Sequence, residues 1–415
     1  MTPPRSLLKI LGPGLVTGAA DDDPSGIATY SQVGAQFGYA LAWTMLFSYP
    51  LMALIQEVAA WIGRVTGVGI AQNLRRHYSP WILRGVVALL LIANIINLGA
   101  DLGAMGAALG LLIGGPERFY AVVFAVVCVV LEIFVSYARY ASVLKWATLV
   151  LFAYVAVVFA VHVPWGTALL DTFVPQFMFD APHAMALVAV LGTTISPYLF
   201  FWQAGQEVEE MHRRHTKALC ITPRDAGAEM TRIRIDTIVG MGFSNLIALF
   251  IVIATAATLH ASGTTDIQTS SQAAEALRPV AGEFAFALFA AGIVGTGMLA
   301  IPVLAGSAAY AVSEVFRWVE GLDRRPREAK SFYGAIAVAT LVGVALNFVD
   351  LDPIKALYWS AVVNGVLAAP LMAVMMVIAM NKRIMGRLTL PPRMFWGGWA
   401  ATIVMAVVTL GFFVL

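Results

Sequence analysis

The sequence predicts an all-α integral membrane protein with eleven transmembrane helices, ten of them in two inverted repeats. Three observations support this fold class: the number and length of the apolar runs, the distribution of basic residues, and a matching interruption in two of the runs. The chain of 415 residues is 60% hydrophobic and only 12% charged, whereas soluble domains carry about 25% charged residues.

Eleven apolar runs have lengths suited to crossing a bilayer, which takes about 20 residues. The polar stretches between them are short loops, so we expect one transmembrane domain over residues 1–415. The runs lie at 8–37, 40–62, 85–113, 119–137, 141–162, 184–207, 235–259, 284–313, 332–349, 356–380 and 395–415.

The basic residues orient the protein. When the runs are followed from an N-terminus placed inside, all 26 Lys and Arg residues fall inside except Arg118, Arg278 and Lys355. This positive-inside bias predicts a multi-pass protein of the cell inner (plasma) membrane with a cytoplasmic N-terminus. The basic residues are spread over several short loops, so we expect no nucleic acid as partner. The expected partner is the lipid bilayer, and we expect the chain to be a monomer.

Two of the runs are interrupted at their middle. The first carries Asp23-Pro24-Ser25-Gly26 and the sixth carries Ser196-Pro197. Proline removes a backbone donor and clashes with the preceding turn, and Gly26 tolerates an irregular backbone. A broken helix persists at membrane depth only where its freed backbone groups line a cavity or meet an ion.

The spacing of the two interruptions predicts inverted repeats. The second interruption comes five spans after the first, so each interruption begins a unit of five spans. Because five is an odd number, the second unit is upside down in the membrane relative to the first. We expect the first repeat over 1–162, the second over 184–380, and an extra helix over 395–415. Broken helices at corresponding positions of such repeats point to a transporter's binding site near the membrane midplane.

Three successive acids, Asp21, Asp22 and Asp23, precede the first interruption. Intramembrane carboxylates are costly and face a polar cavity or an ion, and the first six spans carry almost no deep Lys or Arg as a partner. We therefore expect Asp23 to bind a cation. At most one of the neighbouring aspartates is expected to share its cavity, and we assign this role to Asp22. The alternative is that the acids line a wet vestibule or pair with a cation from another span.

Oxygen atoms around the two interruptions complete the expected metal site. The backbone carbonyls near Ala20 and Thr193 lie three residues before the breaks, where a broken helix frees them. The hydroxyls of Ser25, Thr194 and Ser196 are further candidates. The alternative for each hydroxyl is a hydrogen bond to its own helix backbone.

At these residues the sequence resembles the Nramp family of divalent metal transporters. The family's first span carries D-P-G-N and ends in G-A-Q-F-G-Y, and residues 23–39 read DPSGIATYSQVGAQFGY after GPG at 12–14. GTTISPYLFFWQ, at 192–203, occupies the frame of the family's sixth-span motif, and RIRID, at 232–236, opens the seventh span. The resemblance implies a LeuT-like fold and a metal site at the two breaks.

The sequence departs from the family pattern at the ligand positions. Gly26 replaces the family's asparagine, Ser196 its methionine, and Tyr198 and Gln203 its two histidines. Thioether sulfur favours softer metals, whereas carboxylate, carbonyl and water suit Mg²⁺, Mn²⁺ or Ca²⁺. The pattern is similar to the Nramp-related magnesium transporter branch. The resemblance also places a polar ligand in the tenth span, at Asn364.

Two polar stripes predict an ion or proton pathway. Asn97 and Asp101 lie with Asn94 on one face of the third span, near a family acid implicated in proton transfer. Gln203 and Glu207 continue from the sixth-span break toward the cytoplasm. The alternative for this second stripe is a solvated helix end with Arg213 and Arg214 as counterions.

We expect the chain to import a hard divalent cation, Mg²⁺ or Mn²⁺, as its substrate, with no cofactor. Proton coupling is expected to be weak or absent because the family's histidines, the usual carriers near neutral pH, are missing. A proton-coupled Mn²⁺ or Fe²⁺ importer and a LeuT-fold carrier of an organic solute are the alternatives. An enzyme is not expected, because the six histidines lie near span ends or in loops.

Overall fold

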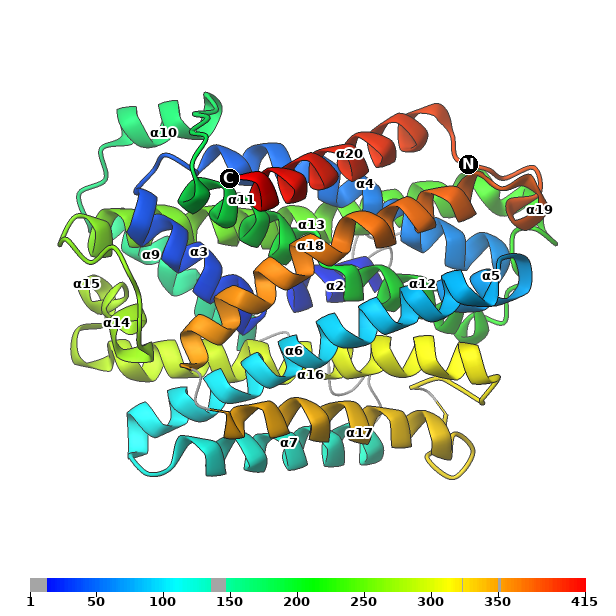
Figure 1. Cartoon of the computed structure of the whole chain (residues 1–415), viewed down its shortest axis with the longest axis horizontal. Helices are drawn as coiled ribbons and strands as arrows, with labels where there is room; N and C mark the ends of the chain where they lie inside the picture. The colour runs from blue at the N-terminus through cyan, green and yellow to red at the C-terminus, as the bar shows by residue number, and fades with distance from the viewer. Residues whose placement is uncertain (1–12, 136–146, 323, 350–351) are drawn as a thin grey trace, which may run out of the picture.

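The structure is a computed structural model that describes residues 13–135, 147–322, 324–349 and 352–415. Within these ranges all regular secondary structure is helical. The long helices run side by side across the molecule, from left to right in Figure 1. Eight helical stretches of this part are long and apolar enough to cross a membrane.

The expected spans correspond to observed helices. Three fall outside the count of eight: the broken first span, α7, and a fifth span that begins with a 3-10 turn. Residues 8–12 of the expected first span, 136–137 of the fourth and 141–146 of the fifth lie outside the described residues. The spans are α2 (Pro13–Asp21) with α3 (Pro24–Phe37), α4 (Trp43–Thr66), α6 (Pro80–Ile113), α7 (Glu117–Phe134), η1 (Ala147–Leu151) with α9 (Phe152–Ala160), α11 (Ala181–Thr194) with α12 (Pro197–Arg213), α13 (Ala226–Thr255) with η3 (Ala256–His260), α16 (Ala285–Phe316), α17 (Lys330–Ala345), α18 (Pro353–Met380) and α20 (Pro392–Val414).

Short helices connect the spans. The seventh span begins at Ala226, earlier than the expected residue 235, because ion pairs stabilise its polar first turns, including Arg232 with Glu229 at 3.0 Å. The connecting helices are α5 (Ile70–His77), α10 (Trp165–Phe173), α14 (Ser270–Glu275), α15 (Arg278–Ala281) and α19 (Lys382–Met385).

Both predicted helix breaks are present. α2 ends at Asp21 and α3 begins at Pro24, while α11 ends at Thr194 and α12 begins at Pro197. In each case the proline occupies the first position of the second half-helix, where its missing N–H costs no hydrogen bond. The residue before each proline is extended, as proline requires: Asp23 has φ −73° and ψ 172°, and Ser196 has φ −73° and ψ 128°.

Each broken helix packs tightly against the second helix of the other expected repeat. α2 approaches α13 so closely that a Cβ atom on Gly18 would lie 2.2 Å from the Gly240 carbonyl oxygen. α12 approaches α4 in the same way, since a Cβ atom on Gly63 would lie 2.3 Å from the Ala204 carbonyl oxygen. This reciprocal packing is what an inverted repeat predicts. The repeat boundaries at 162, 184 and 380 remain a prediction.

The two ends of the bundle differ in charge. We call the end where α4, α12 and α16 finish and α13 starts the basic side; it lies at the right of Figure 1.

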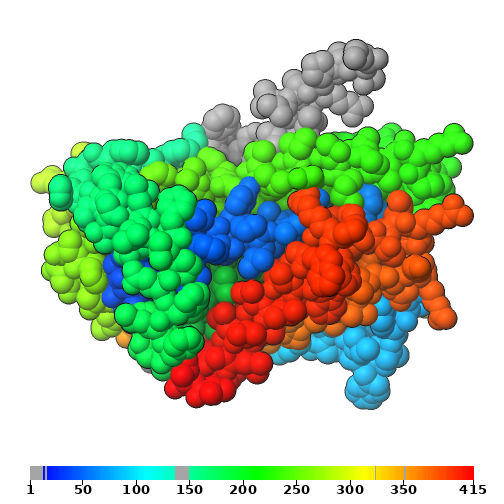
Figure 2. Space-filling model, turned by 90° about the horizontal axis from the view of Figure 1, so that it is seen from above, coloured from blue at the N-terminus to red at the C-terminus, as the bar shows by residue number. Residues whose placement is uncertain are grey.

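α20 lies on the outside of the bundle against α4, α11 and α18 (Figure 2). Its outward side chains are apolar and exposed, as expected for a surface that faces lipid; they include Trp396, Ile403, Val407, Leu410 and Phe413.

We predict that Gly18→Ala and Gly63→Ala each lower the unfolding temperature of the detergent-purified protein. The added methyl group meets backbone that cannot move aside, and overpacking of this kind costs about 1–3 kcal/mol. Gly85→Ala is the control, because a Cβ atom there has nothing within 4 Å and alanine favours a helix. Equal unfolding temperatures for Gly18→Ala, Gly63→Ala and Gly85→Ala would contradict the close packing.

Candidate functional site

The Asp23 side chain lies where the two helix breaks meet. Its Oδ1 accepts a hydrogen bond from the Gly26 amide at 2.8 Å, so Asp23 caps the start of α3. Its Oδ2 accepts from Asn97 Nδ2 at 3.2 Å and from the Tyr198 hydroxyl at 3.1 Å. Residues of α6 and α12 thus hold a carboxylate that is 1% exposed.

The backbone of one break faces the other. A Cβ atom on Gly26 would lie 3.2 Å from Thr193 Oγ1 and 3.4 Å from the Asp21 carbonyl oxygen. The Ala20 carbonyl oxygen lies 3.5 Å from the Tyr198 hydroxyl, beside Asp23. The Ala20 carbonyl thus lies beside the Asp23 carboxylate, whereas the Thr193 carbonyl accepts from Ser196 Oγ at 2.8 Å and only the Thr193 side chain is seen to face the first break.

Several buried oxygens around Asp23 make no hydrogen bond of standard geometry within the described ranges. Buried polar atoms without partners are rare in native proteins, and each requires an explanation such as a water or an ion. Carboxylate, amide and hydroxyl oxygens are the ligands of hard cations, so these atoms fit such an ion or its waters. They are Ser25 Oγ, Thr193 Oγ1, Asn97 Oδ1 and both carboxylate oxygens of Asp101. Asn364 Oδ1 of α18 is also buried without such a bond, but among the described residues no contact joins it to Asp23.

Two of the expected hydroxyl ligands are turned toward their own helix. Ser196 Oγ donates to the carbonyls of Gly192 and Thr193 at 3.0 and 2.8 Å. Thr194 Oγ1 donates to the Val190 carbonyl at 2.9 Å. For these two residues the structure shows the backbone hydrogen bond that was the alternative, while their oxygen lone pairs stay available as acceptors.

The three successive aspartates do not converge. The Ser244 hydroxyl of α13 lies 2.8 Å from Asp21 Oδ2 and 3.0 Å from Asp22 Oδ1, while Asp23 turns to α6 and α12. Asp22 therefore lies with Asp21 rather than with Asp23. Among the residues that the structure describes, no group of three or more His, Cys, Asp or Glu side chains is placed to hold one metal ion.

The polar stripe on α6 is buried as predicted. Asn94 donates to the Leu304 carbonyl and to Ser307 Oγ of α16, at 2.9 and 2.6 Å, so it serves helix packing. Asn97 turns to Asp23, and Asp101 lies close enough to Asp23 for their charges to interact. Asn97 and Asp101 thus belong to the candidate site, and Asn94 does not.

The second predicted pathway, along α12, is closed by polar contacts. The Thr17 hydroxyl of α2 donates to Gln203 Oε1, and Glu207 forms an ion pair with Arg232. Glu210 pairs with Arg213 and Arg214 at 2.9 and 2.5 Å. At this residue the structure shows the alternative, a helix end with these two arginines as counterions.

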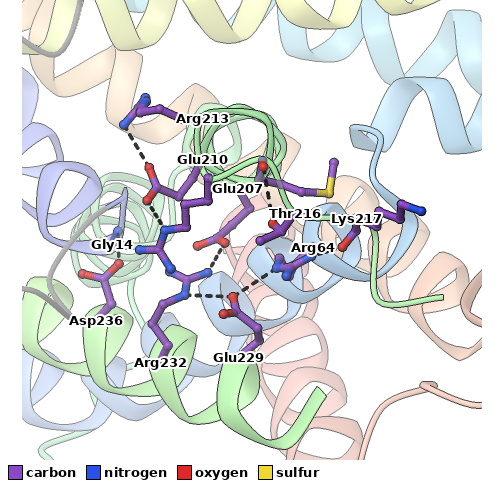
Figure 3. A network of polar contacts seen from close by, with 12 residues as sticks. Gly14, Arg64, Glu207, Glu210, Arg213, Thr216, Lys217, Glu229, Arg232 and Asp236 are labelled. Atoms are coloured by element: carbon purple, nitrogen blue, oxygen red, sulfur yellow. Dashed lines mark hydrogen bonds and ion pairs between the residues drawn. The ribbon is translucent and has the colours of Figure 1, made fainter. Parts of the chain in front are cut away.

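Glu207 belongs to a row of alternating charges (Figure 3). Arg232 Nε also contacts Glu229 Oε2 at 3.0 Å, and the same oxygen lies 3.0 Å from Arg64 Nε. We call Arg64, Glu229, Arg232 and Glu207 the charge row; it ties together α4, α13 and α12 on the basic side. The Gly14 amide at the start of α2 donates to Asp236 Oδ2 at 2.8 Å nearby.

An open cavity of about 450 Å³ lies at the opposite end of the bundle. It reaches Ala28, in the second turn of α3, but the residues of the Asp23 site do not line it. Its polar wall includes Gln32, Gln36 and Asp266, and its apolar wall includes Met185 and Tyr358. In this structure the Asp23 site is thus covered on the basic side, and the vestibule formed by this cavity on the other side stops short of it at Ala28.

The sequence analysis missed several residues of this region. Tyr198 was noted as a substituted histidine, but its hydrogen bond to Asp23 was not predicted. Ser244 and the partner of Glu207 were also missed. Arg232 was visible in the RIRID motif. Its partner, Glu207, lies on another helix and 25 residues away in the sequence, and no local pattern reveals such a partner.

Two broken helices that face each other across a buried carboxylate define a membrane protein of the LeuT-like fold. The manganese transporter of Eremococcus coleocola superposes with a TM-score of 0.74, at 18% identity, over 99% of this chain and 88% of that one. MhsT in complex with L-phenylalanine superposes with a TM-score of 0.62, at 12% identity, over 96% of this chain and 98% of that one. These likenesses confirm the predicted fold class.

Residues 14–415 match the family model described as Nramp, natural resistance-associated macrophage protein-like. The chain belongs to the Nramp family, as its motifs indicated. It is 28% identical to the divalent metal cation transporter MntH of Verminephrobacter eiseniae over 379 residues, which cover 88% of this chain and 83% of that protein. The MntH of Klebsiella pneumoniae is 26% identical over 400 residues, covering 95% and 91%. These relatives are named as transporters, which agrees with the expectation that the chain is not an enzyme.

We predict that Asp23→Ala destabilises the protein more than Asp23→Asn does in metal-free buffer. Asparagine still caps α3 by accepting from the Gly26 amide, whereas loss of a cap to alanine costs about 1 kcal/mol. Thermal unfolding of the two purified variants measures the difference. Equal unfolding temperatures would mean that the hydrogen bond to Gly26 contributes nothing to the break.

Proposed function

We propose that the chain imports a hard divalent cation, Mg²⁺ or Mn²⁺, through a site at the breaks of the first and sixth spans. The observation that carries this proposal is the buried Asp23 carboxylate, beside which several oxygen atoms make no hydrogen bond of standard geometry within the described ranges. Membership of the Nramp family and relatives named divalent metal cation transporters support the class of substrate.

The side chains at the family's ligand positions favour a hard ion. Ser196 replaces the thioether that selects softer metals, and the Tyr198 hydroxyl engages Asp23 where the family carries an imidazole. Mg²⁺ dehydrates reluctantly and is bound through one or two carboxylates with several waters retained. The buried oxygens of Ser25, Thr193 and Asp101 are acceptors suited to such waters.

The basic side is proposed to be cytoplasmic, in the plasma (inner) membrane, with one chain acting as a monomer. A potential that is negative inside then drives entry of a double charge with about 4.6 kcal/mol per 100 mV, twice the value for one charge. Proton coupling is proposed to be weak or absent, since both sixth-span histidines of the family are replaced, by Tyr198 and Gln203.

Transport in this direction requires an ion to enter from the vestibule and to leave past α2. The ion would pass Ala28 to reach Asp23, where Asn97 and Tyr198 orient the carboxylate. Release requires the Thr17–Gln203 contact to open and the start of α2 to leave Asp236. α2 is thus the proposed movable cover, while the charge row holds α4, α12 and α13 together beneath it.

We predict that proteoliposomes with an inside-negative potential take up Mg²⁺ and Mn²⁺ but little Cd²⁺. Asp23→Asn should reduce uptake at least about tenfold, because loss of one charge-assisted ligand is worth about 1.5–3 kcal/mol. Ser196→Met should raise Cd²⁺ uptake relative to Mg²⁺ by supplying a soft ligand. Uptake is measured with ion-sensitive dyes and a lumenal pH probe.

Asp180→Asn is the matched control for Asp23→Asn. Asp180 also caps a helix, accepting from the His183 amide at 2.9 Å, but it lies on the exposed end of α11. Uptake that acidifies the lumen in step with Mn²⁺ would favour the alternative, a proton-coupled transition-metal importer. No uptake of any cation would reject the proposed function.

We predict that Asp236→Ala speeds amide hydrogen exchange in residues 13–21 several-fold without affecting the other spans. The Gly14 amide would lose its buried acceptor, which costs about 1–3 kcal/mol. Asp352→Ala is the matched control, because Asp352 caps α18 at the opposite end of the bundle. Unchanged exchange in α2, or faster exchange throughout the protein, would contradict the role of α2 as a cover.

A further inference from the structure

We propose that Asp21 and Asp22, with the Ser244 hydroxyl, form a second binding site for a hydrated divalent cation beside the Asp23 site. The inference rests on the proposed function, because it assigns two carboxylates that a single ion at Asp23 leaves unused. It gives the chain two cation sites of different composition, separated by the turn from α2 into α3.

Asp21 and Asp22 share one hydrogen-bond donor, the Ser244 hydroxyl, which is too few for two carboxylates. Ser244 Oγ lies 2.8 Å from Asp21 Oδ2 and 3.0 Å from Asp22 Oδ1. A serine hydroxyl has a single proton to donate, so it satisfies one of these oxygens and leaves the other facing an oxygen lone pair. The remaining oxygens, Asp21 Oδ1 and Asp22 Oδ2, are buried without a hydrogen bond in the described ranges.

An independent side chain points to a ligand at this place. The Tyr30 hydroxyl of α3 is buried, with the residue 1% exposed; it interacts with the Thr193 side chain but makes no hydrogen bond of standard geometry. The charges of all three aspartates act on it, and that of Asp21 acts most strongly. A water bound to a cation between Asp21 and Asp22 would give this hydroxyl a partner, and Tyr30 would lie between the two sites.

The charge balance favours a cation over a structural pair of acids. Asp21 and Asp22 are each 1% exposed, and none of the ion pairs found among the described residues includes them. Buried charges without a counterion are strongly unfavourable. Mg²⁺ is typically bound by one or two carboxylates with its other positions filled by water, which suits two carboxylates and one hydroxyl.

The two sites are distinct because the backbone turns between their ligands. Asp21 ends α2 and faces α13, whereas Asp23 is extended and directs its carboxylate to Asn97 and Tyr198. A single ion that used all three carboxylates would need a convergence that the described side chains do not show. Occupancy of one site should therefore survive loss of the other.

Counting bound Mn²⁺ by electron paramagnetic resonance, on the full chain in lipid nanodiscs, tests the proposal. We expect two Mn²⁺ per wild-type chain, both displaced by excess Mg²⁺. Asp23→Asn should retain one, and the Asp21→Asn/Asp22→Asn variant should retain one. Ser244→Ala, which leaves the carboxylates in place, should weaken one of the two sites about tenfold.

The wild-type count alone decides the proposal, so it does not depend on the folding of any variant. A single Mn²⁺ per wild-type chain overturns it and leaves a shared proton as the counterpart of Asp21 and Asp22. Loss of both ions in Asp21→Asn/Asp22→Asn, at an unchanged unfolding temperature, also overturns it. If vesicles take up Mn²⁺ while the count is one, only this inference fails; if they take up no cation and none binds, the proposed function fails with it.

Discussion

The break in the first span depends on one carboxylate that has two roles. A helix interrupted at membrane depth must satisfy its freed amides within the protein, because lipid provides no hydrogen-bond partner. Asp23 does this for α3 by accepting from the Gly26 amide, and its second oxygen meets Asn97 and Tyr198. These contacts join α6 and α12 to the break. The group that caps α3 at the break is thus also the carboxylate at which we propose that a cation binds.

Much of this arrangement follows from local sequence. Hydrophobic length predicts the spans, since each must cross the same apolar layer, and proline predicts both breaks, since it cannot continue a helix hydrogen-bond pattern. Asp23 was identifiable because three acids in an apolar run are costly unless they face a polar cavity or an ion. The α6 stripe was predictable because a helix repeats its faces at fixed intervals.

The contacts between distant residues could not be predicted in this way. Ser244 approaches Asp21 and Asp22 from a position more than 220 residues away in the sequence, on a helix that packs closely against α2 at Gly18 and Gly240. The direction of a hydroxyl group cannot be predicted from the sequence either, because the Ser196 side chain could turn to its own helix backbone or to the site. Sequence patterns describe one helix at a time, whereas these features depend on how two helices meet.

The charge row on the basic side has a consequence for how this region changes over evolution. Its members alternate in sign, Arg64, Glu229, Arg232 and Glu207, and their formal charges sum to zero. A neutral wall neither repels a departing cation nor retains it. Replacement of any one member leaves an unbalanced charge beside the proposed exit, and replacement of an adjacent Arg–Glu pair does not. Substitutions in this row should therefore accumulate in compensating pairs across relatives, so that covariation between α12 and α13 would mark the proposed exit route more clearly than the identity of any single residue.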